Sequence, residues 1–302
     1  MSDYPKPKGM YTILPLPLTR SFEIDEAVLR KSIDWAVEAE AIGIVATGSV
    51  GEFSHMEKDE RLRVMDVSID QIRKHSGVKA VAMTAAAGTL ETIKYTKYAK
   101  ETGYDYALIV PPYYWKIGEE EVFLHYKMIA DAVKVPLIVY HNEITSKFAI
   151  SVTFAKRLSE IPEIVGMKEM KHDLAFLMSL YDEMASKIGI LQTFRVYLNA
   201  LMLGASGGAI TSFALPACVR ITKLYEKGNF AAAMNIQQAL NKLFKGSTEG
   251  AGVLGRIKAA CSLVSGLDFG PPRPPYMMPQ GREMEMLKAN FDHLSKVMES
   301  TK

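Results

Sequence analysis

A lysine and a tyrosine stand near the ends of two consecutive apolar segments of the chain. Lys168 lies within IVGMKEM (164–170), and Tyr140 lies near the end of PLIVYH (136–141). A charged amine is costly to bury. Either the first segment ends early and Lys168 points into water, or the buried amine takes part in a reaction. A neutral amine can attack a ketone and form a Schiff base, and a tyrosine hydroxyl beside it can carry the protons.

Two further segments contain residues that could bind a 2-keto acid. GSVGE (48–52) combines the Ser49 hydroxyl with glycines that allow the backbone to approach a ligand closely. PPYYW (111–115) supplies Tyr113 and Tyr114. Each signal alone is weak, because a lysine at a strand end is usually solvated, a tyrosine pair after prolines usually packs, and GSVGE resembles many turns. Together, at matching strand ends, they indicate Schiff-base chemistry.

The hydropathy pattern predicts the elements that position these residues. Short apolar runs alternate with segments of helical periodicity, and Asp25, Thr89 and Ser151 are expected N-caps. Eight such units favour a closed (β/α)8 TIM barrel over an open doubly wound sheet, because no glycine-rich dinucleotide fingerprint follows the first strand. The predicted strands are 9–16, 43–48, 79–85, 106–111, 136–141, 164–170, 188–194 and 207–212. The predicted helices are 25–40, 57–74, 90–102, 119–132, 151–160, 174–186, 196–203 and 216–227.

The alternation stops after residue 228, and only helical segments follow. GPPRPP (270–275) reads as a rigid connector between two of them. We therefore predict a catalytic barrel domain over 1–228 and a helical extension over 229–302 that packs on it. In such a barrel the active site lies at the carboxyl ends of the strands. The three helices predicted in the extension are 229–245, 250–265 and 281–300.

Composition excludes several classes of protein. The 302 residues are 48% hydrophobic and 23% charged, which is typical of soluble globular proteins. No long basic run favours nucleic acid, no apolar run reaches the ~18 residues of a membrane span, and the first ten residues lack the apolar core of a signal peptide. Cys218 and Cys261 fit neither a metal-ligand spacing nor a disulfide framework. We expect a cytoplasmic protein that binds no membrane and no nucleic acid.

In order and spacing, these motifs resemble the dihydrodipicolinate synthase and N-acetylneuraminate lyase family, the pyruvate-type class I aldolases. GSVGEFSHMEKDER (48–61) is similar to the family's Gly-Ser/Thr-Thr-Gly-Glu turn, VPLIVYH (135–141) to its tyrosine strand, and VGMKE (165–169) to its lysine strand. PPYYWK, LGASGGAIT (203–211) and GPPRPP (270–275) are similar to further signatures. The resemblance covers nearly the whole chain. It implies a covalent Schiff base without a cofactor or metal, and a homotetramer built as a dimer of dimers.

The resemblance also implies a role for each site residue. Lys168 would form the Schiff base, and Tyr140 would be the proton shuttle. Ser49 would hold the substrate carboxylate and join a hydroxyl relay, which Tyr114 would complete from a neighbouring subunit. The substrate-binding residues implied are Gly48 and Gly51, which shape the turn, Val50 through its backbone amide, and Ile210 through its backbone carbonyl.

Three departures from the family pattern bear on the substrate. Val50 replaces a second hydroxyl residue, which removes one hydrogen bond worth about 1 kcal/mol. In HNEITSK (141–147), Thr145 falls about where the synthases have an arginine, which counts against dihydrodipicolinate synthesis. Phe194 and Arg195 occupy the region where sialate lyases have acidic residues. Arg195 follows a predicted strand and could bind a distal carboxylate with its planar guanidinium; a solvated arginine at a helix start is the alternative.

What remains is an aldolase or lyase for a 2-keto acid, such as a 2-keto-3-deoxy sugar acid, with pyruvate and an aldehyde as the other reactants. Dehydration of such an acid through the same lysine imine is the close alternative. Phe194, Trp115 and Met170 could instead line an apolar pocket for an aromatic aldehyde, which would match the hydratase-aldolases of the same family.

Two alternatives come from other classes of protein. A metal-dependent barrel lyase needs converging ligands, but Glu169 should face away from Lys168 on a strand, and no His pair has ligand spacing. Val50 and the unusual HNEITSK loop also allow a catalytically silent protein that binds a 2-keto acid. His141 is either a base near the substrate or a satisfied core histidine, and we favour the second. The candidate metal ligands are Glu52, His141, Glu143, Glu169 and His172.

Overall fold

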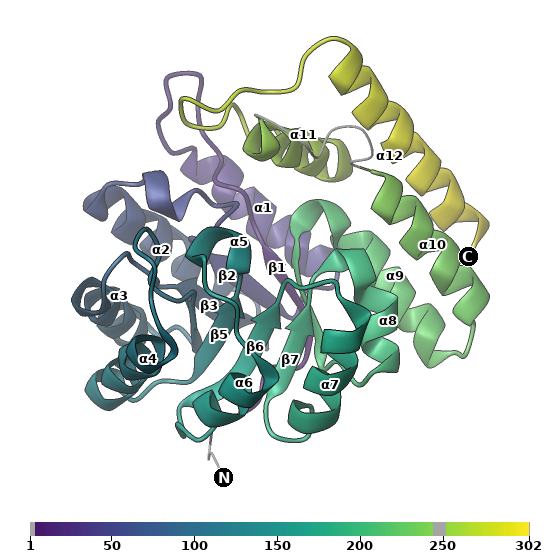
Figure 1. Ribbon diagram of the computed structural model, residues 1–302. Coiled ribbons are helices and arrows are strands. Elements are labelled where there is room, and N and C mark those ends of the chain that lie inside the picture. The colour runs from purple at the N-terminus through teal and green to yellow at the C-terminus, as the bar shows by residue number, and fades with distance from the viewer. Residues whose placement is uncertain (1–3, 244–251, 302) are drawn as a thin grey trace.

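The computed structural model describes residues 4–243 and 252–301 of the chain. Its centre is a closed barrel of eight parallel strands that pair in sequence order, and each strand is followed by at least one helix (Figure 1). This confirms the predicted TIM barrel. The strands are β1 (Gly9–Ile13), β2 (Gly43–Ala46), β3 (Lys79–Met83), β4 (Tyr106–Ile109), β5 (Leu137–His141), β6 (Ile164–Glu169), β7 (Gly189–Gln192) and β8 (Gly207–Thr211).

The barrel helices lie where the sequence predicts them. They are α1 (Glu26–Glu38), α2 (Lys58–Ile72), α3 (Thr89–Thr102), α4 (Glu119–Val133), α6 (Val152–Leu158), α7 (Leu174–Met184), α8 (Tyr197–Met202) and α9 (Leu215–Glu226). Four short elements are additional to the prediction, and each follows the carboxyl end of a strand. They are η1 (Phe53–His55), α5 (Glu143–Ser146), η2 (Phe194–Val196) and η3 (Ser212–Ala214).

Two of the three predicted N-caps are confirmed. The Asp25 side chain accepts a hydrogen bond from the backbone N–H of Val28, and Ser151 caps α6 in the same way. The prediction for Thr89 is wrong by one residue, because Gly88 holds the capping position and α3 begins at Thr89 itself. The Thr89 hydroxyl instead lies 2.9 Å from Nδ1 of His125 on α4.

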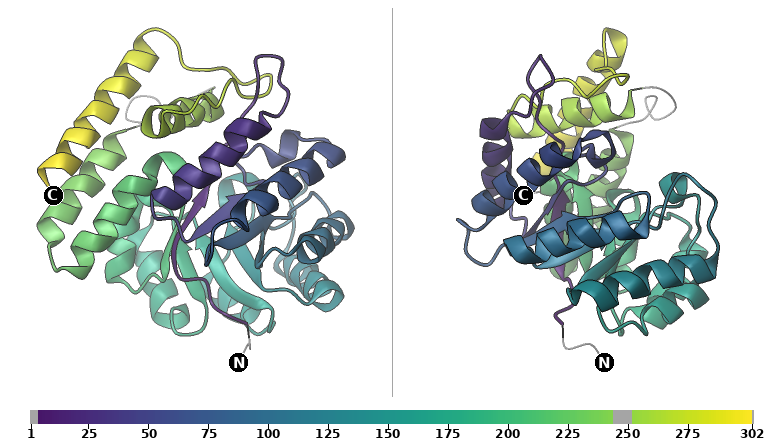
Figure 2. Two further views of the ribbon diagram at one scale, coloured as in Figure 1. Left: turned by 180° about the vertical axis from the view of Figure 1, so that it is seen from behind. Right: turned by 90° about the vertical axis from the view of Figure 1, so that its left-hand side faces the viewer.

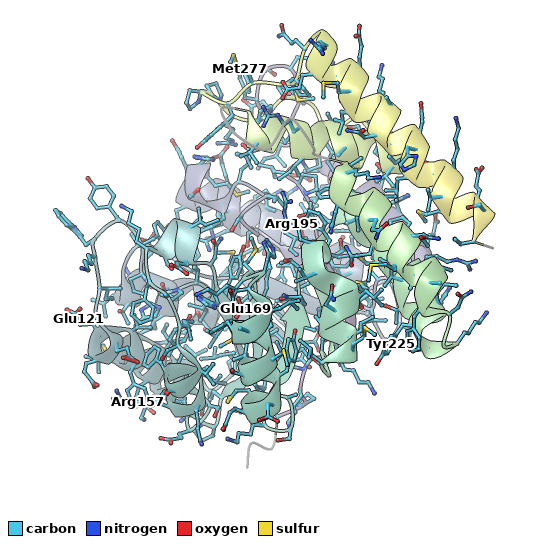
Figure 3. All side chains as sticks on the ribbon, turned by 45° about the vertical axis from the view of Figure 1, so that its right-hand side comes forward. Glu121, Arg157, Glu169, Arg195, Tyr225 and Met277 are labelled. Carbon is cyan, nitrogen blue, oxygen red and sulfur yellow. The ribbon has the colours of Figure 1, made fainter. Side chains whose placement is uncertain are left out.

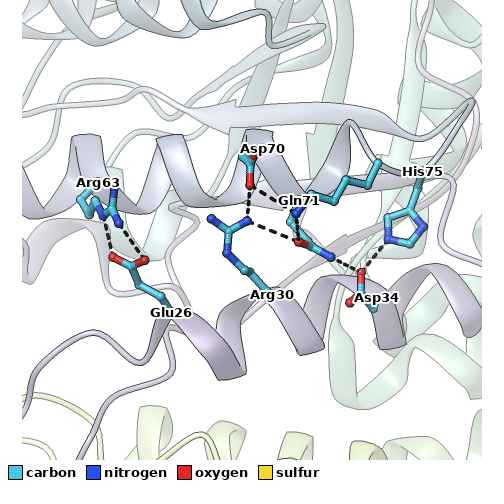
Figure 4. A network of polar contacts seen from close by, with 8 residues as sticks. Glu26, Arg30, Asp34, Arg63, Asp70, Gln71 and His75 are labelled. Atoms are coloured by element: carbon cyan, nitrogen blue, oxygen red, sulfur yellow. Dashed lines mark hydrogen bonds and ion pairs between the residues drawn. The ribbon is translucent and has the colours of Figure 1, made fainter.

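Helices α1 and α2 are joined on the outside of the barrel by polar side chains (Figure 4). Arg63 donates two hydrogen bonds to Glu26, at 2.6 and 2.8 Å. Exposed ion pairs of this kind contribute at most about 1 kcal/mol each, so they align the two helices more than they stabilise the fold. The other members of this set are Arg30, Asp34, Asp70, Gln71 and His75.

Three helices follow the barrel: α10 (Phe230–Lys242), α11 (Val253–Ser265) and α12 (Arg282–Ser300). They match the predicted segments, except that residues 244–245 and 250–251 of those predictions lie outside the described residues. Helix α10 packs against α9 and α12, and α11 packs on η3. Figures 1 and 2 show α11 at the end of the barrel opposite to the N-terminus, which is the end where the strands terminate. The extension therefore covers part of the expected active-site face.

Cys218 and Cys261 are buried free thiols. None of the helices that the structure describes has the length and apolar composition needed to span a bilayer.

Buried His125 should make stability depend on pH. It is 2% exposed, and burial lowers its pKa from 6.5 to about 4. Between these pH values the unfolded chain binds a proton that the folded protein does not. The free energy of unfolding therefore falls as the pH drops, and this residue lowers it by about 2–3 kcal/mol at pH 4.5 relative to pH 7. Urea unfolding at pH 7 and 4.5 should show a smaller pH dependence for His125→Gln than for the wild type. An equal pH dependence in both proteins would contradict the assignment.

Candidate active site

A cavity of about 320 Å³ opens at the carboxyl ends of the strands, between the barrel and α11. It brings together six of the nine residues that the sequence predicts to be catalytic or to bind substrate, although the six come from five separate parts of the chain. The barrel topology explains this, because parallel strands of a closed sheet present their carboxyl ends at one face. The six are Ser49 and Val50 after β2, Tyr140 on β5, Lys168 on β6, Arg195 in η2, and Ile210 on β8.

Lys168 points into this cavity and not into bulk water. Its residue is 6% exposed, and Tyr140 is 3% exposed. The two residues are paired in register on adjacent strands, and the lysine Nζ lies 4.0 Å from the centroid of the tyrosine ring. The register and the cavity together place the amine and the phenol side by side, as the sequence predicts.

The surroundings of Tyr140 fix its hydroxyl. It accepts a hydrogen bond of 3.1 Å from Nδ2 of Asn142 and donates to the sulfur of Met170 at 3.3 Å. Sulfur is a weak acceptor, so the phenol proton is held only loosely, while the Asn142 donor would stabilise negative charge on the oxygen. Such a hydroxyl can both give and take a proton.

Lys168 has no carboxylate to hold it as an ion pair. Its amine forms no salt bridge within the described part of the chain, and among the residues that line the cavity none is acidic. The lining is mainly apolar and includes Ile13, Ala209 and Phe213. A lysine amine in such a pocket is available as a nucleophile toward a carbonyl carbon.

Some residues of the GSVGE turn face the cavity, and others pack against the protein beneath it. Ser49 and Val50 line the cavity, whereas Gly48 and Gly51 do not. A Cβ on Gly48 would come within 2.3 Å of the Ile13 side chain, and one on Gly51 would be 3.1 Å from the backbone nitrogen of Gly48. The two glycines therefore allow the tight path that presents Ser49 and Val50 to a ligand.

The last residue of the turn, Glu52, is bound to the C-terminal extension. Its side chain is fully buried, and Oε1 lies 2.8 Å from Nζ of Lys258 on α11. Oε2 accepts the backbone N–H of Arg273 at 2.9 Å, and Lys258 also donates to the carbonyl of Pro271 at 2.7 Å. Burial lowers the pKa of Lys258, and Glu52 offsets part of this effect. The sequence analysis missed this ion pair, which ties α11 to the turn.

Tyr114 is not brought to the other site residues within one chain. Its side chain is exposed, it makes an edge-on ring contact with exposed Trp115, and neither residue lines the cavity. Tyr113 turns inward instead and packs edge-on against Phe53 of η1. A role for Tyr114 beside a neighbouring subunit's cavity stays a prediction.

His141 is a satisfied core histidine, as favoured from the sequence. The backbone N–H of Ile150 donates to its Nε2 at 3.0 Å, so that nitrogen carries no proton and Nδ1–H donates to Oε2 of buried Glu169 at 2.8 Å. The other Glu169 oxygen accepts the backbone N–H of Lys171 at 2.6 Å. Within residues 4–243 and 252–301, no group of three or more His, Cys, Asp or Glu side chains is placed to hold a metal ion.

Arg195 lines the cavity, and its role in binding a distal carboxylate stays a prediction. Its backbone carbonyl accepts a hydrogen bond of 2.8 Å from Asn241 of α10, which fixes the 3-10 turn that carries it. Figure 3 shows Arg195 in the space between the barrel and the C-terminal helices. Its guanidinium forms no ion pair with any of the described residues, so it is free to bind a ligand. Phe194 and Met170 also line the cavity.

Helix α11 supplies lining residues that the sequence analysis missed. Val253, Arg256 and Ile257 face the cavity. A TIM barrel carries its catalytic groups at the strand ends, and none of these three residues follows a strand. The available signal was the helical spacing of these three residues, which puts them on one face of α11.

Comparison with known proteins agrees with this architecture. The sequence model of the dihydrodipicolinate synthetase family matches residues 6–293. An uncharacterised DapA-like lyase of Thermococcus kodakarensis is 31% identical over 289 residues, which cover 92% of this chain and 96% of that protein. The 4-hydroxy-tetrahydrodipicolinate synthase of Methylacidiphilum fumariolicum superposes with a TM-score of 0.88 at 26% identity and covers 98% of each chain. A sialic acid aldolase of Ruminococcus gnavus shares the fold, with a TM-score of 0.89 at 17% identity over the full length of both chains.

Proposed function

Because the chain belongs to the dihydrodipicolinate synthetase family, a family of lyases, we propose that it is a class I aldolase that forms or cleaves a 2-keto acid through a Schiff base, with pyruvate as one reactant. The observation that carries this proposal is the placement of Lys168. Its amine is buried at the mouth of the barrel, 4.0 Å from the Tyr140 ring, in a cavity lined by no acidic residue of the described chain.

In the proposed reaction, the neutral Nζ of Lys168 attacks the keto carbon of the substrate. The Tyr140 hydroxyl gives its proton to the hydroxyl group that leaves as water, so that a protonated imine and a Tyr140 phenolate remain. In the cleavage direction the hydroxyl on C4 loses its proton to this phenolate, the C3–C4 bond breaks, and its electron pair moves into the imine. An aldehyde leaves, Tyr140 returns the proton to C3 of the remaining enamine, and hydrolysis releases pyruvate and the free amine while the phenolate takes back its proton. Condensation is the reverse sequence, and no cofactor or metal is required.

The carboxylate next to the keto group has a matching site in the GSVGE turn. We propose that the Ser49 hydroxyl and the Val50 backbone N–H bind it, while the Ile210 carbonyl faces the reacting carbons. Val50 offers no side-chain hydroxyl, so the turn holds this carboxylate with fewer hydrogen bonds than a turn with two hydroxyl residues.

Tyr114 would complete a hydroxyl relay only in an oligomer. Tyr114 is exposed and does not line the cavity of its own chain, so we propose that it acts on a neighbouring subunit of a homotetramer. A solution mass equal to that of one chain would exclude this role.

Dehydration of a 2-keto-3-deoxy acid is the second candidate, because it passes through the same imine and uses the same two residues. Product analysis on a panel of 2-keto acids separates the two reactions: pyruvate plus an aldehyde indicates cleavage, and a keto-semialdehyde without pyruvate indicates dehydration. Phe194 and Met170 in the cavity wall are compatible with a partly apolar aldehyde.

Borohydride trapping tests the proposal directly. The protein is incubated with pyruvate, reduced with borohydride and digested. The mass of the peptide that contains Lys168 is then measured by mass spectrometry. We expect a reduced pyruvate adduct on Lys168 in the wild type and none in Lys168→Ala. The absence of an adduct with pyruvate and with longer 2-keto acids, on folded protein, would contradict Schiff-base chemistry and favour a silent binding protein.

A further inference from the structure

Helix α11 carries a cation that the proposed chemistry does not use. Arg256 lines the cavity and is only 9% exposed. Its Nε donates to Glu283 on α12, but its Nη1 is buried and has no hydrogen-bond partner among the described residues. An unsatisfied N–H on a buried cation costs free energy, so the Arg256 guanidinium would gain an acceptor if the side chain turned toward an anion bound in the cavity that it lines.

The formal charges around the cavity are all positive. Lys168, Arg195 and Arg256 line it, and no Asp or Glu of residues 4–243 and 252–301 does. The carboxylate of Glu283 is engaged through the Nε of Arg256 and lies outside the lining, with its side chain 34% exposed. If the carboxylate next to the keto group is bound by the GSVGE turn, the Arg195 guanidinium remains without an anion, and the Arg256 guanidinium keeps its Nη1 without an acceptor among the described residues.

The two arginines come from different parts of the fold but face the same space. Arg195 follows β7, Arg256 lies on α11, and both line the cavity. His172 also lines the cavity, and partial desolvation and the positive charge of Arg195 lower its pKa. This shift favours the neutral form of His172. The cavity volume of about 320 Å³ is within the range of small-molecule sites and exceeds what a three-carbon acid fills.

We propose that Arg195 and Arg256 form a second anion site, and that the substrate carries a carboxylate or phosphate at the end remote from its keto acid. Guanidinium groups match both anions through paired N–H donors. In the condensation direction the acceptor aldehyde would then be anionic. This inference rests on the proposed Schiff-base function, because Lys168 fixes the position of the keto end.

The test compares aldehydes that differ only in the remote charge. Condensation with pyruvate is measured for succinate semialdehyde against butanal, and for glyceraldehyde 3-phosphate against glyceraldehyde. The wild type should favour one anionic aldehyde over its neutral counterpart by at least about tenfold in kcat/KM, and the preferred pair identifies carboxylate or phosphate. Arg256→Gln and Arg195→Ala should each raise KM for the anionic aldehyde about tenfold more than KM for the neutral aldehyde, which corresponds to ~1.4 kcal/mol.

Glu283→Gln is the matched control. It breaks the ion pair that joins α11 to α12 but keeps the Arg256 guanidinium, so it should retain the anionic preference. If Arg256 only anchors α11, Glu283→Gln and Arg256→Gln will affect charged and neutral aldehydes alike, and the inference is wrong. If the glutamine variant does not fold, Arg256→Lys replaces it in the test. Lysine keeps the positive charge but lacks the planar guanidinium, so KM for the anionic aldehyde should lie between those of the wild type and Arg256→Gln.

Borohydride trapping with pyruvate on the same proteins separates this inference from the proposed function. Both arginine variants should give the Lys168 adduct as readily as the wild type. A wild type that forms the adduct and shows no preference for anionic aldehydes refutes the second anion site alone. A wild type that forms no adduct refutes the Schiff-base proposal.

Discussion

Replacing Lys168 with methionine is expected to lower kcat at least about ten-thousandfold, because the nucleophile of a covalent mechanism is removed. Methionine has nearly the length of lysine and is apolar, so it fills the same space beside Tyr140 without adding a buried charge. The thermal unfolding midpoint should therefore not fall. Turnover of the best substrate found in the aldehyde panel is the measurement.

Lys171 provides the matched control, because it lies in the same stretch of sequence. It is partly exposed, its Nζ pairs with Glu143 at 3.4 Å, and it does not line the cavity. Lys171→Met should keep kcat within about twofold of the wild type, since surface ion pairs contribute little. If Lys168→Met were to retain more than a tenth of wild-type turnover, the reaction could not depend on a lysine imine.

Replacing Lys258 with methionine is expected to destabilise the fold by about 3–5 kcal/mol, because it leaves the Glu52 carboxylate buried without its partner. Both side chains are at most 1% exposed, so water cannot take the place of the ammonium group. Equilibrium unfolding in urea measures the effect. KM for pyruvate should also rise, because Glu52 closes the turn that presents Ser49 and Val50.

Removing both charges should cost less than the sum of the single changes. In Lys258→Met/Glu52→Gln no charge is left buried, so a double-mutant cycle should give a coupling of about 1–3 kcal/mol. Lys223→Met, which breaks an exposed pair with Glu40, should cost less than about 1 kcal/mol. A Lys258→Met variant as stable as Lys223→Met would show that the buried pair does not hold the extension.

The barrel could be predicted because each strand is a short apolar run followed by a helical repeat, and eight such units have one closed arrangement. The strand-end residues could be predicted for the same reason: topology alone brings Ser49, Tyr140 and Lys168 to one face. Adjacent residues at a helix start are harder to separate, which explains the error at Thr89. Helix α5 has four residues, too few for its periodicity to be read.

The contribution of α11 could not be predicted, because it depends on tertiary packing. Periodicity shows that Arg256 and Ile257 share a face of a helix, but not which part of the barrel that face meets. The ion pair between Glu52 and Lys258 joins segments that are far apart in sequence, and either residue alone reads as a surface charge. Tyr114 is exposed in the single chain, and the role proposed for it requires a neighbouring subunit.

Helix α11 also separates two kinds of evolutionary change. The lysine and tyrosine of the proposed chemistry lie on barrel strands, whereas Val253, Arg256 and Ile257 lie on a helix that follows the last barrel strand in the chain. We therefore expect that substitutions on this face of the helix change the substrate and leave the proposed reaction of the barrel residues in place. Lys258 lies two residues after Arg256 on the same helix and pairs with the buried Glu52 of the turn. A graft of α11 between relatives that keep this glutamate should therefore tolerate variation at Arg256 and not at Lys258.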